Sequence, residues 1–199
     1  MSTIDRVDVR GDAEPSSLAR RFALLVPRLV AASTATEVLT LLAEAAQRFL
    51  PAVDAVSVTA RVGDGTLHTP VSIGPAAAEL DRIQYDLGEG PCIDASHMIG
   101  PGVAASSDLA TTRAWPGFGA AAAALGYVAV VSAALAPEPG LPALGALNVY
   151  ARRRPAIAAT EHDVALLLAT HGALALAHAQ ALSYAELQHG RLVRAEHPH

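Results

Sequence analysis

Residues 55–73, AVSVTARVGDGTLHTPVSI, decide the fold because they alternate apolar and polar side chains on both sides of a glycine-rich turn. An alternation with a period of two predicts half-buried β-strands over 55–62 and 67–73. Gly63-Asp64-Gly65 between the two runs predicts a β-hairpin. Pro70 indicates that the second strand is an edge strand or contains a bulge. A hairpin at this point favours an antiparallel sheet.

Two later segments extend this sheet. Residues 127–136 and 143–151 are apolar in nearly every position, which is typical of central strands covered on both faces. The segment 137–142 between them contains three prolines and a glycine, so we expect a second hairpin there.

Helical patterns lie at both ends of the chain. A stripe of apolar residues predicts a first helix, interrupted by Pro27. Thr34 and Glu37 have the spacing of a capping box for a second helix over 36–50. A short helix is expected over 76–84, and a long one begins at Thr160. The stripe of the first helix is Leu18, Phe22, Leu25 and Leu29, and the long helix carries Val164, Leu168, His171, Leu174, His178 and Leu182.

This order of elements predicts an α+β domain with a central antiparallel sheet. The terminal helices are expected on one face, and the irregular segment 85–126 is expected to cover the other with loops and short helices. We interpret residues 1–15 as a disordered arm, 16–185 as the folded domain, and 186–199 as a frayed C-terminal tail.

Composition excludes several classes of protein. The chain has 199 residues and a net charge of -5, which argues against a surface that coats nucleic acid. Its single cysteine excludes an intrachain disulfide framework and a multi-cysteine zinc site. The polar, acidic N-terminus is unlike a signal peptide, and we expect no membrane-spanning segment. A cytoplasmic location follows from these expectations.

The segment 85–95, YDLGEGPCIDA, resembles the signature of bacterial GAF domains of the kind coupled to ANTAR modules. The resemblance continues through SDL at 107–109, RAWP at 113–116, GY at 126–127 and LGALNVY at 144–150, and it extends from about residue 18 to residue 182. It implies a GAF fold and a small-molecule or redox sensor that signals through dimerised terminal helices. Transcription regulation in bacteria is implied as well.

The ANTAR module of that family binds RNA, and this sequence departs from the paired arrangement. Only 17 residues follow Leu182, which is too short for a three-helix module, and they contain no basic cluster. We therefore expect a sensor without the ANTAR module and no direct binding of nucleic acid.

The candidate ligand pocket lies between the sheet and segment 85–126. Gly90 and Gly88 permit a tight turn before Pro91, which suits the first position of a helix. The amides at that helix start could receive an anion or a carbonyl group. Aromatic residues could line the pocket with polar tips, although core packing is their commoner fate. The candidate pocket residues are Tyr85, Gly90, Cys92, His97, Trp115, Tyr127, Asn148 and Tyr150.

Three of these residues have specific alternatives. Cys92, near a helix N-terminus, could be a reactive thiol of lowered pKa, but a small buried apolar side chain is the favoured reading. Ile93 follows Cys92 where bilin-binding relatives have histidine, so a bilin is not expected. His97 is the best candidate for an axial haem ligand. Asn148 lies among apolar strand residues, where its amide needs a ligand or backbone partners.

Two further groups carry polar chemistry outside this list. Asp86, Glu89 and Asp94 form a local acidic group, which we interpret as solvated loop charges or helix caps. His171 and His178 are seven residues apart on one helix face, too far apart for one metal ion. We interpret these two histidines as interface or core residues that could respond to pH.

The leading hypothesis is a non-enzymatic GAF-type sensor that binds an unidentified small molecule and forms a homodimer through helices 18–33 and 160–188. We assign no catalytic residue and no metal site, and the sequence does not identify a cofactor. Two alternatives stay open at this point: an interaction scaffold with a vestigial pocket, and a redox switch centred on Cys92.

Overall fold

The computed structural model describes residues 18–154 and 157–196, with side chains described up to residue 184. The expected arm over 1–15 and residues 197–199 of the expected tail lie outside the described residues. In chain order the elements are α1 (Leu18–Ala31), α2 (Ala35–Phe49), β1 (Ala55–Arg61), β2 (Leu67–Ile73), α3 (Ala77–Leu87), α4 (Pro91–Ser96), β3 (Val103–Ser106), a 3-10 turn (Leu109–Thr111), α5 (Pro116–Ala124), β4 (Ala129–Ala134), β5 (Gly145–Ala151) and α6 (Ala159–Glu196).

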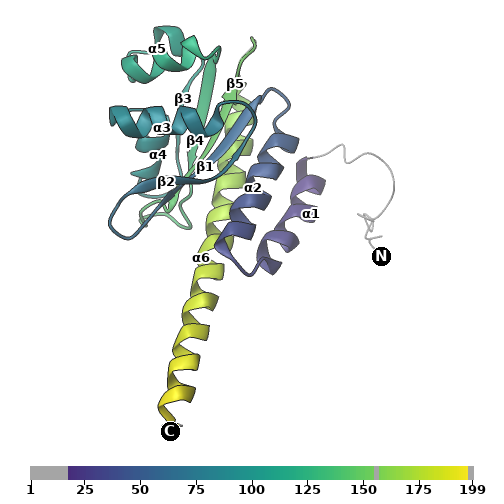
Figure 1. The fold of residues 1–199 in the computed structure, drawn as a ribbon. Coiled ribbons are helices and arrows are strands. Elements are labelled where there is room, and N and C mark those ends of the chain that lie inside the picture. Colours follow the sequence, from purple (N-terminus) through teal and green to yellow (C-terminus); the bar gives the residue numbers. More distant parts are fainter. Residues whose placement is uncertain (1–17, 155–156, 197–199) are drawn as a thin grey trace, which may run out of the picture.

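A five-stranded antiparallel sheet in the order β2-β1-β5-β4-β3 forms the middle layer. Helices α2 and α6 pack on one face, with α1 lying over both of them. Helices α3 and α4 pack on the opposite face, and α5 lies against α3 (Figure 1). The predicted α+β architecture, with terminal helices on one face and short helices on the other, is confirmed.

The predicted hairpin of β1 and β2 is confirmed, and so is its irregularity at Pro70. Val58 pairs with Val71, whereas Ala60 pairs with His68, so two steps along β1 correspond to three steps along β2. This extra residue in β2 is a β-bulge next to Pro70. Because β2 is an edge strand, Pro70 removes no hydrogen bond that a central strand would need.

The expectation that β1 is half-buried is wrong. Ser57 and Thr59 are 0 % exposed, like the valines that alternate with them. The reason is tertiary: α3 covers the face on which these hydroxyls lie, and they form hydrogen bonds there.

Strand β3 was missed, because its four residues, VAAS, are too few to establish an alternation. It lies within the segment expected to be irregular and pairs with β4 as the second edge of the sheet.

The capping box predicted for α2 is confirmed. The Thr34 side chain accepts a hydrogen bond from the Glu37 amide at 3.2 Å, and the Glu37 carboxylate accepts one from the Thr34 amide at 3.2 Å. Helix α1 continues through Pro27 to Ala31.

Helix α6 is 38 residues long and continues to Glu196, past residue 185, where a frayed tail was expected. Its C-terminal part extends away from the rest of the domain (Figure 1). The stretch Ala159–Tyr184 is long and apolar enough to cross a membrane, by length and composition. Of the relevant window, 44% is buried within the protein, and the expectation of no membrane-spanning segment stays a prediction.

Gly145 is required where β5 begins beside β1. Its φ is +155°, and a Cβ atom at this position would lie 1.9 Å from the Thr59 carbonyl oxygen. Any other side chain would therefore push the two central strands apart.

We predict that Gly145→Ala lowers the free energy of unfolding by about 2 kcal/mol or more, because the new methyl group meets backbone rather than a movable side chain. Urea unfolding measures this loss. Gly63→Ala is the matched control, since nothing lies within 4 Å of a Cβ atom there. Equal stabilities of the two variants would contradict the prediction.

Candidate functional site

Asp81 lies at the centre of a buried polar cluster between the sheet and α3. The buried face of α3 carries Ala77, Leu80, Asp81 and Gln84, which follow the three- and four-residue spacing of one helix face. Asp81 is 0 % exposed and therefore lies where an apolar residue is usual.

The Asp81 carboxylate accepts four hydrogen bonds from three strands. Its Oδ1 accepts from the Ser57 hydroxyl at 2.8 Å, the Tyr150 hydroxyl at 2.6 Å and the Asn148 amide at 3.3 Å. Its Oδ2 accepts from the Thr69 hydroxyl at 2.8 Å. Within the described part of the chain, no Arg or Lys forms an ion pair with Asp81. Hydroxyls and an amide thus take the place of a counter-ion.

The hydroxyl groups form a chain that leads to Asp81. Thr69 donates to Asp81, so its oxygen can accept from the Tyr85 hydroxyl at 2.9 Å. Tyr85 can in turn accept from Thr59 at 3.0 Å, and Thr59 accepts from the Asn148 amide at 2.9 Å. Every hydrogen then has an acceptor when Asp81 is ionised, which favours the charged carboxylate.

Gln84 connects this cluster to the glycine-rich segment before α4. Its Nε2 donates to the Tyr150 hydroxyl at 3.0 Å, and its Oε1 accepts from the Cys92 amide at 2.9 Å. A Cβ atom on Gly90 would lie 2.3 Å from that same Oε1. Gly90 is therefore needed because the Gln84 side chain packs directly against its backbone.

Burial raises the pKa of Asp81, and its hydrogen bonds from Tyr150, Ser57 and Thr69 offset part of this rise. Burial likewise raises the pKa of Tyr150 and of Tyr85, and the negative charge of Asp81 raises both further. The cluster therefore resists the loss of a proton from either tyrosine.

Three buried polar atoms near this cluster have no hydrogen-bond partner: Asn148 Oδ1, Ser132 Oγ and Ser96 Oγ. Ser132 on β4 pairs directly with Asn148 on β5, and Ser57 on β1 pairs with Asn148 from the other side. These three residues form a polar row across the sheet, and its Ser57 end joins the Asp81 cluster. At the other end of the row, Asn148 Oδ1 and Ser132 Oγ have no hydrogen-bond partner.

Five of the predicted pocket residues meet at this cluster: Tyr85, Gly90, Cys92, Asn148 and Tyr150. Tyr127 lies beside them, with its ring centroid 5.9 Å from that of Tyr150 in an edge-to-face arrangement. Its hydroxyl donates to the Pro75 carbonyl.

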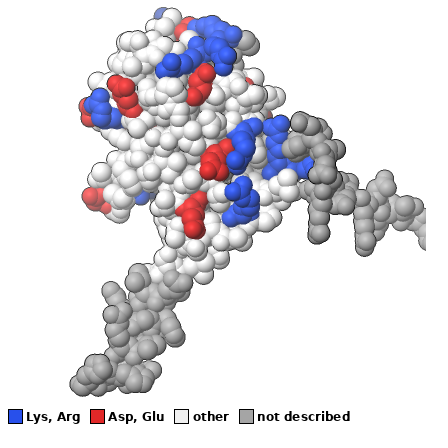
Figure 2. Space-filling view, turned by 45° about the vertical axis from the view of Figure 1, so that its right-hand side comes forward, with Lys and Arg blue, Asp and Glu red and all other residues white. Residues whose placement is uncertain are grey.

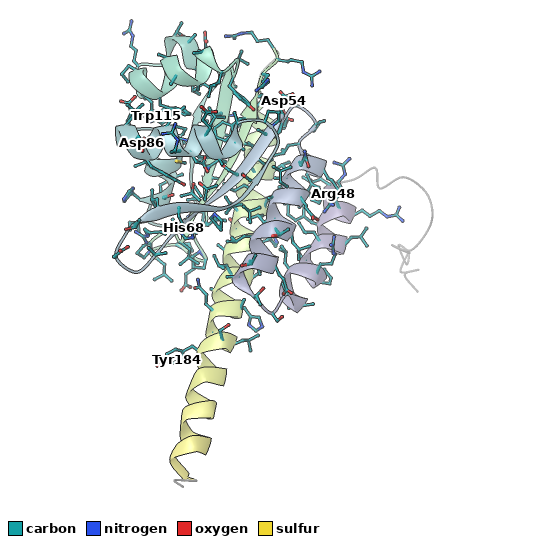
Figure 3. The ribbon with its side chains drawn as sticks, viewed as in Figure 1. Arg48, Asp54, His68, Asp86, Trp115 and Tyr184 are labelled. Carbon is teal, nitrogen blue, oxygen red and sulfur yellow. The ribbon has the colours of Figure 1, made fainter. Side chains whose placement is uncertain are left out.

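Trp115 is the N-cap residue of α5, and its Nε1 donates to Asp94 Oδ2 of α4 at 2.9 Å (Figure 3). Trp115 therefore connects the start of α5 to α4, and it belongs to the same buried cluster as Tyr127 and Tyr150.

His97 does not join the cluster. Its side chain is exposed, and its Nδ1 is 2.8 Å from the Ile93 carbonyl of the same short helix.

Cys92 is 0 % exposed, which confirms its interpretation as a small buried side chain. Burial raises the pKa of the Cys92 thiol, so the alternative of a lowered pKa at the helix start is wrong.

Of the acidic residues Asp86, Glu89 and Asp94, only Glu89 acts as one of the expected helix caps. Glu89 accepts a hydrogen bond from the Phe118 amide at 2.7 Å in the first turn of α5. Asp94 accepts from Trp115, and Asp86 forms an ion pair with Arg82 on the same helix. These contacts hold α5 and α4 together.

Three hollows lie on the opposite side of the sheet, against α1, α2 and α6. An open groove of about 420 Å³ between α1 and α2 is lined by Arg21, Leu24, Leu25, Arg28, Arg48 and Phe49. Figure 2 shows basic side chains on that side of the molecule, with acidic side chains next to them. A smaller hollow of about 140 Å³ lies between α1 and α6. The candidate site itself is closely packed with protein side chains.

Sequence reasoning missed the residues that organise the site, above all Asp81 and Gln84. The signal was present, because both fall in the same helical stripe as Leu80. Ser57 and Thr59 were placed on an exposed strand face, and Ser132 was not singled out.

Solved structures share this fold. The chain is similar to a domain of a protein assigned as a two-component sensor histidine kinase from Sinorhizobium meliloti 1021, with 20% identity, a TM-score of 0.59 and coverage of 76% of this chain and 96% of that one. It is similar to the GAF domain/HD domain protein from Geobacter sulfurreducens, with 16% identity and a TM-score of 0.54. The match covers 77% of this chain and 99% of that one. It is also similar to the cyanobacteriochrome TePixJ GAF domain, with 17% identity and a TM-score of 0.58. This match covers 78% of this chain and 95% of that one.

The sequence matches no protein-family model, and no curated protein matches it. The structural similarities support a GAF-like fold for this chain.

We predict that Asp81→Asn changes how stability depends on pH. The pKa of Asp81 is higher in the folded protein than in the unfolded chain, where it is about 3.9. Protonation of Asp81 therefore stabilises the folded protein fully below this unfolded pKa, and the stabilisation is lost as the pH rises through the folded pKa. Wild type should therefore gain stability relative to Asp81→Asn as pH falls. Urea unfolding between neutral and acidic pH, followed by Trp115 fluorescence, measures the difference.

Asp64→Asn is the control of opposite sign. Hydrogen bonds from Thr66 lower the pKa of Asp64, so wild type should lose stability relative to this variant as pH falls. Parallel pH profiles for wild type and Asp81→Asn would contradict the prediction for Asp81.

Proposed function

We propose that this protein is a non-enzymatic, cytoplasmic sensor domain that binds a small molecule between the sheet and α3–α4 and acts through a homodimer of its terminal helices. The observation that carries the proposal is the polar row Ser57–Asn148–Ser132, which is satisfied at one end and unsatisfied at the other. Unpartnered buried polar groups cost free energy, so they are retained where another molecule completes them. The names of two structural neighbours, a sensor histidine kinase and a cyanobacteriochrome, support the class of function.

The three buried side-chain atoms without a hydrogen-bond partner define which donors and acceptors a ligand would need. Asn148 Oδ1 accepts hydrogen bonds, and the hydroxyls of Ser132 and Ser96 can donate or accept. A ligand with at least one N–H or O–H group would satisfy Asn148.

Since α4 packs directly on β4 and β5, the ligand has to enter through a conformation in which α4 and its flanking loops have moved. Binding would then stabilise a minor open state.

The site is connected to α6 through β5. Asn148 and Tyr150 lie on β5, which ends at Ala151, and α6 begins at Ala159. The segment between them is held at three points: Arg152 lies 4.5 Å over the Tyr127 ring, Arg153 pairs with Asp54 at 3.4 Å, and Arg154 pairs with Asp108 at 2.9 Å.

A shift of β5 on ligand binding would therefore reach α6 through a short, tethered connection. This is the route by which occupancy of the site would change the packing of the dimer helices.

The second candidate function is an interaction scaffold with a vestigial pocket. The close packing of the site favours it, because Ser57, Asp81 and Asn148 are each 0 % exposed. The Cys92 redox switch has no comparable support, since the thiol is fully buried.

We predict that a member of a panel of nucleotides, amino acids and haem raises the melting temperature of the wild-type protein, and that Ser132→Ala reduces this shift. A ligand at 100 times its Kd adds about 2.7 kcal/mol of stability. Ser132→Ala by itself should leave stability unchanged or higher, because it removes an unpartnered hydroxyl. Thermal unfolding and native mass spectrometry measure both effects.

Ser72→Ala is the matched control, because Ser72 pairs with Ser57 in the sheet but is exposed at its edge. A panel without any response would favour the scaffold. An equal shift in wild type and Ser132→Ala would place the ligand away from the polar row.

A further inference from the structure

One exposed face of α6 has the spacing of a coiled-coil seam. Leu167, His171, Leu174, His178 and Ala181 follow one another at steps of four, three, four and three residues. Leu167 and Leu174 are 43% and 52% exposed, His178 and Ala181 are exposed, and His171 is partly buried. The opposite face of the helix packs on the protein's own core through Ala165, Leu168, Ala169, Ala173, Leu176 and Ala179.

The histidines are the only ionisable side chains of this seam. Between Asp163 and Glu186 the sequence contains no Asp, Glu, Lys or Arg, although the chain as a whole has a net charge of -5. Two copies of a protein with net negative charge repel each other overall, and this uncharged stretch adds nothing to that repulsion. A second copy also offers a stripe of identical heptad register, which is what a parallel pair of helices requires.

The surroundings of the two histidines are apolar. Both line the hollow between α1 and α6, together with Val26, Leu29, Val30, Leu174 and Ala175, and this lining contains no acidic residue and no arginine. From α1, the Phe22 ring packs against His171 at 5.2 Å. Arg21 and Arg28 of the same helix line the separate groove against α2. On the other side of α6, Leu42 of α2 lies against Gly172.

The geometry of His171 identifies which nitrogen takes up a proton. Its Nδ1 is 2.7 Å from the Leu167 carbonyl oxygen, which can only accept a hydrogen bond. Nδ1 therefore carries the hydrogen in the neutral ring, and Nε2 is the bare nitrogen.

We propose that a second copy of this chain pairs with the seam in parallel, so that His171 and His178 each meet their counterpart and make the dimer sensitive to protons. The proposal rests on the dimer of the proposed function and adds a regulatory signal to it. Equivalent seam positions face each other across the two-fold axis of a parallel pair. Neutral imidazoles can be accommodated there, whereas up to four imidazolium charges in an apolar seam repel one another and lose their hydration.

The test measures the monomer–dimer equilibrium of the full chain by sedimentation and light scattering at mildly alkaline and mildly acidic pH. We expect a dimer at alkaline pH and a Kd raised at least about tenfold at acidic pH, where imidazole gains its proton. The double variant His171→Leu, His178→Leu should dimerise equally at both pH values. Circular dichroism at each pH checks that the fold is intact.

A permanent charge tests the same idea at constant pH. His178→Arg should be monomeric at alkaline pH, where the wild-type protein is a dimer. His68→Arg is the matched control, since His68 is an exposed residue of β2, away from the seam (Figure 3). It should leave the dimer unchanged.

The outcomes separate this inference from the proposed function. A dimer of equal Kd at both pH values, or a dimeric His178→Arg, overturns the proton sensitivity and leaves the dimer of the proposed function standing. A wild-type protein and a double leucine variant that are monomeric at every pH overturn the dimer itself, and this inference with it.

Discussion

The buried carboxylate of Asp81 holds α3 in place on one face of the sheet. Asp81 has no cation partner among the described residues, so its charge has to be stabilised by hydrogen bonds. Those bonds come from β1, β2 and β5, and each donor is in turn positioned by another polar group. The position of α3 on the sheet therefore depends on polar geometry as well as on apolar contact, and Gln84 extends this dependence to α4.

The two faces of the sheet are built on different physical principles. The face under α2 and α6 is apolar, with leucines, valines and alanines in close contact. The face under α3 and α4 combines an aromatic and alanine-rich cluster with a buried hydrogen-bond network. A polar network requires specific partners, so it favours one arrangement of the cover. A few unsatisfied groups at its margin, on Asn148, Ser132 and Ser96, leave a place where a different arrangement could be stabilised.

Local patterns explain which parts of the fold could be read from the sequence. The hairpin around Gly63–Gly65, the Thr34–Glu37 capping box and the long C-terminal helix all depend on residues close together in the chain. Strand β3 was missed because four residues contain too little pattern. The helical stripe with Leu80 could have placed Asp81 on the buried face of α3, but its hydrogen-bond partners lie up to 69 positions away and no local pattern identifies them.

The sequence by itself determined the terminal helices, the hairpin of β1 and β2, the central strands β4 and β5, and hence an antiparallel sheet. Periodicity, turn residues and caps are local properties, and they act before distant segments meet. Only the tertiary structure decided that Ser57 and Thr59 are buried, that Gly90 has to remain glycine beside Gln84, and that His97 lies outside the site. Burial and hydrogen-bond partnership arise when α3 and α4 close over the sheet, and no neighbouring residue in the chain specifies them.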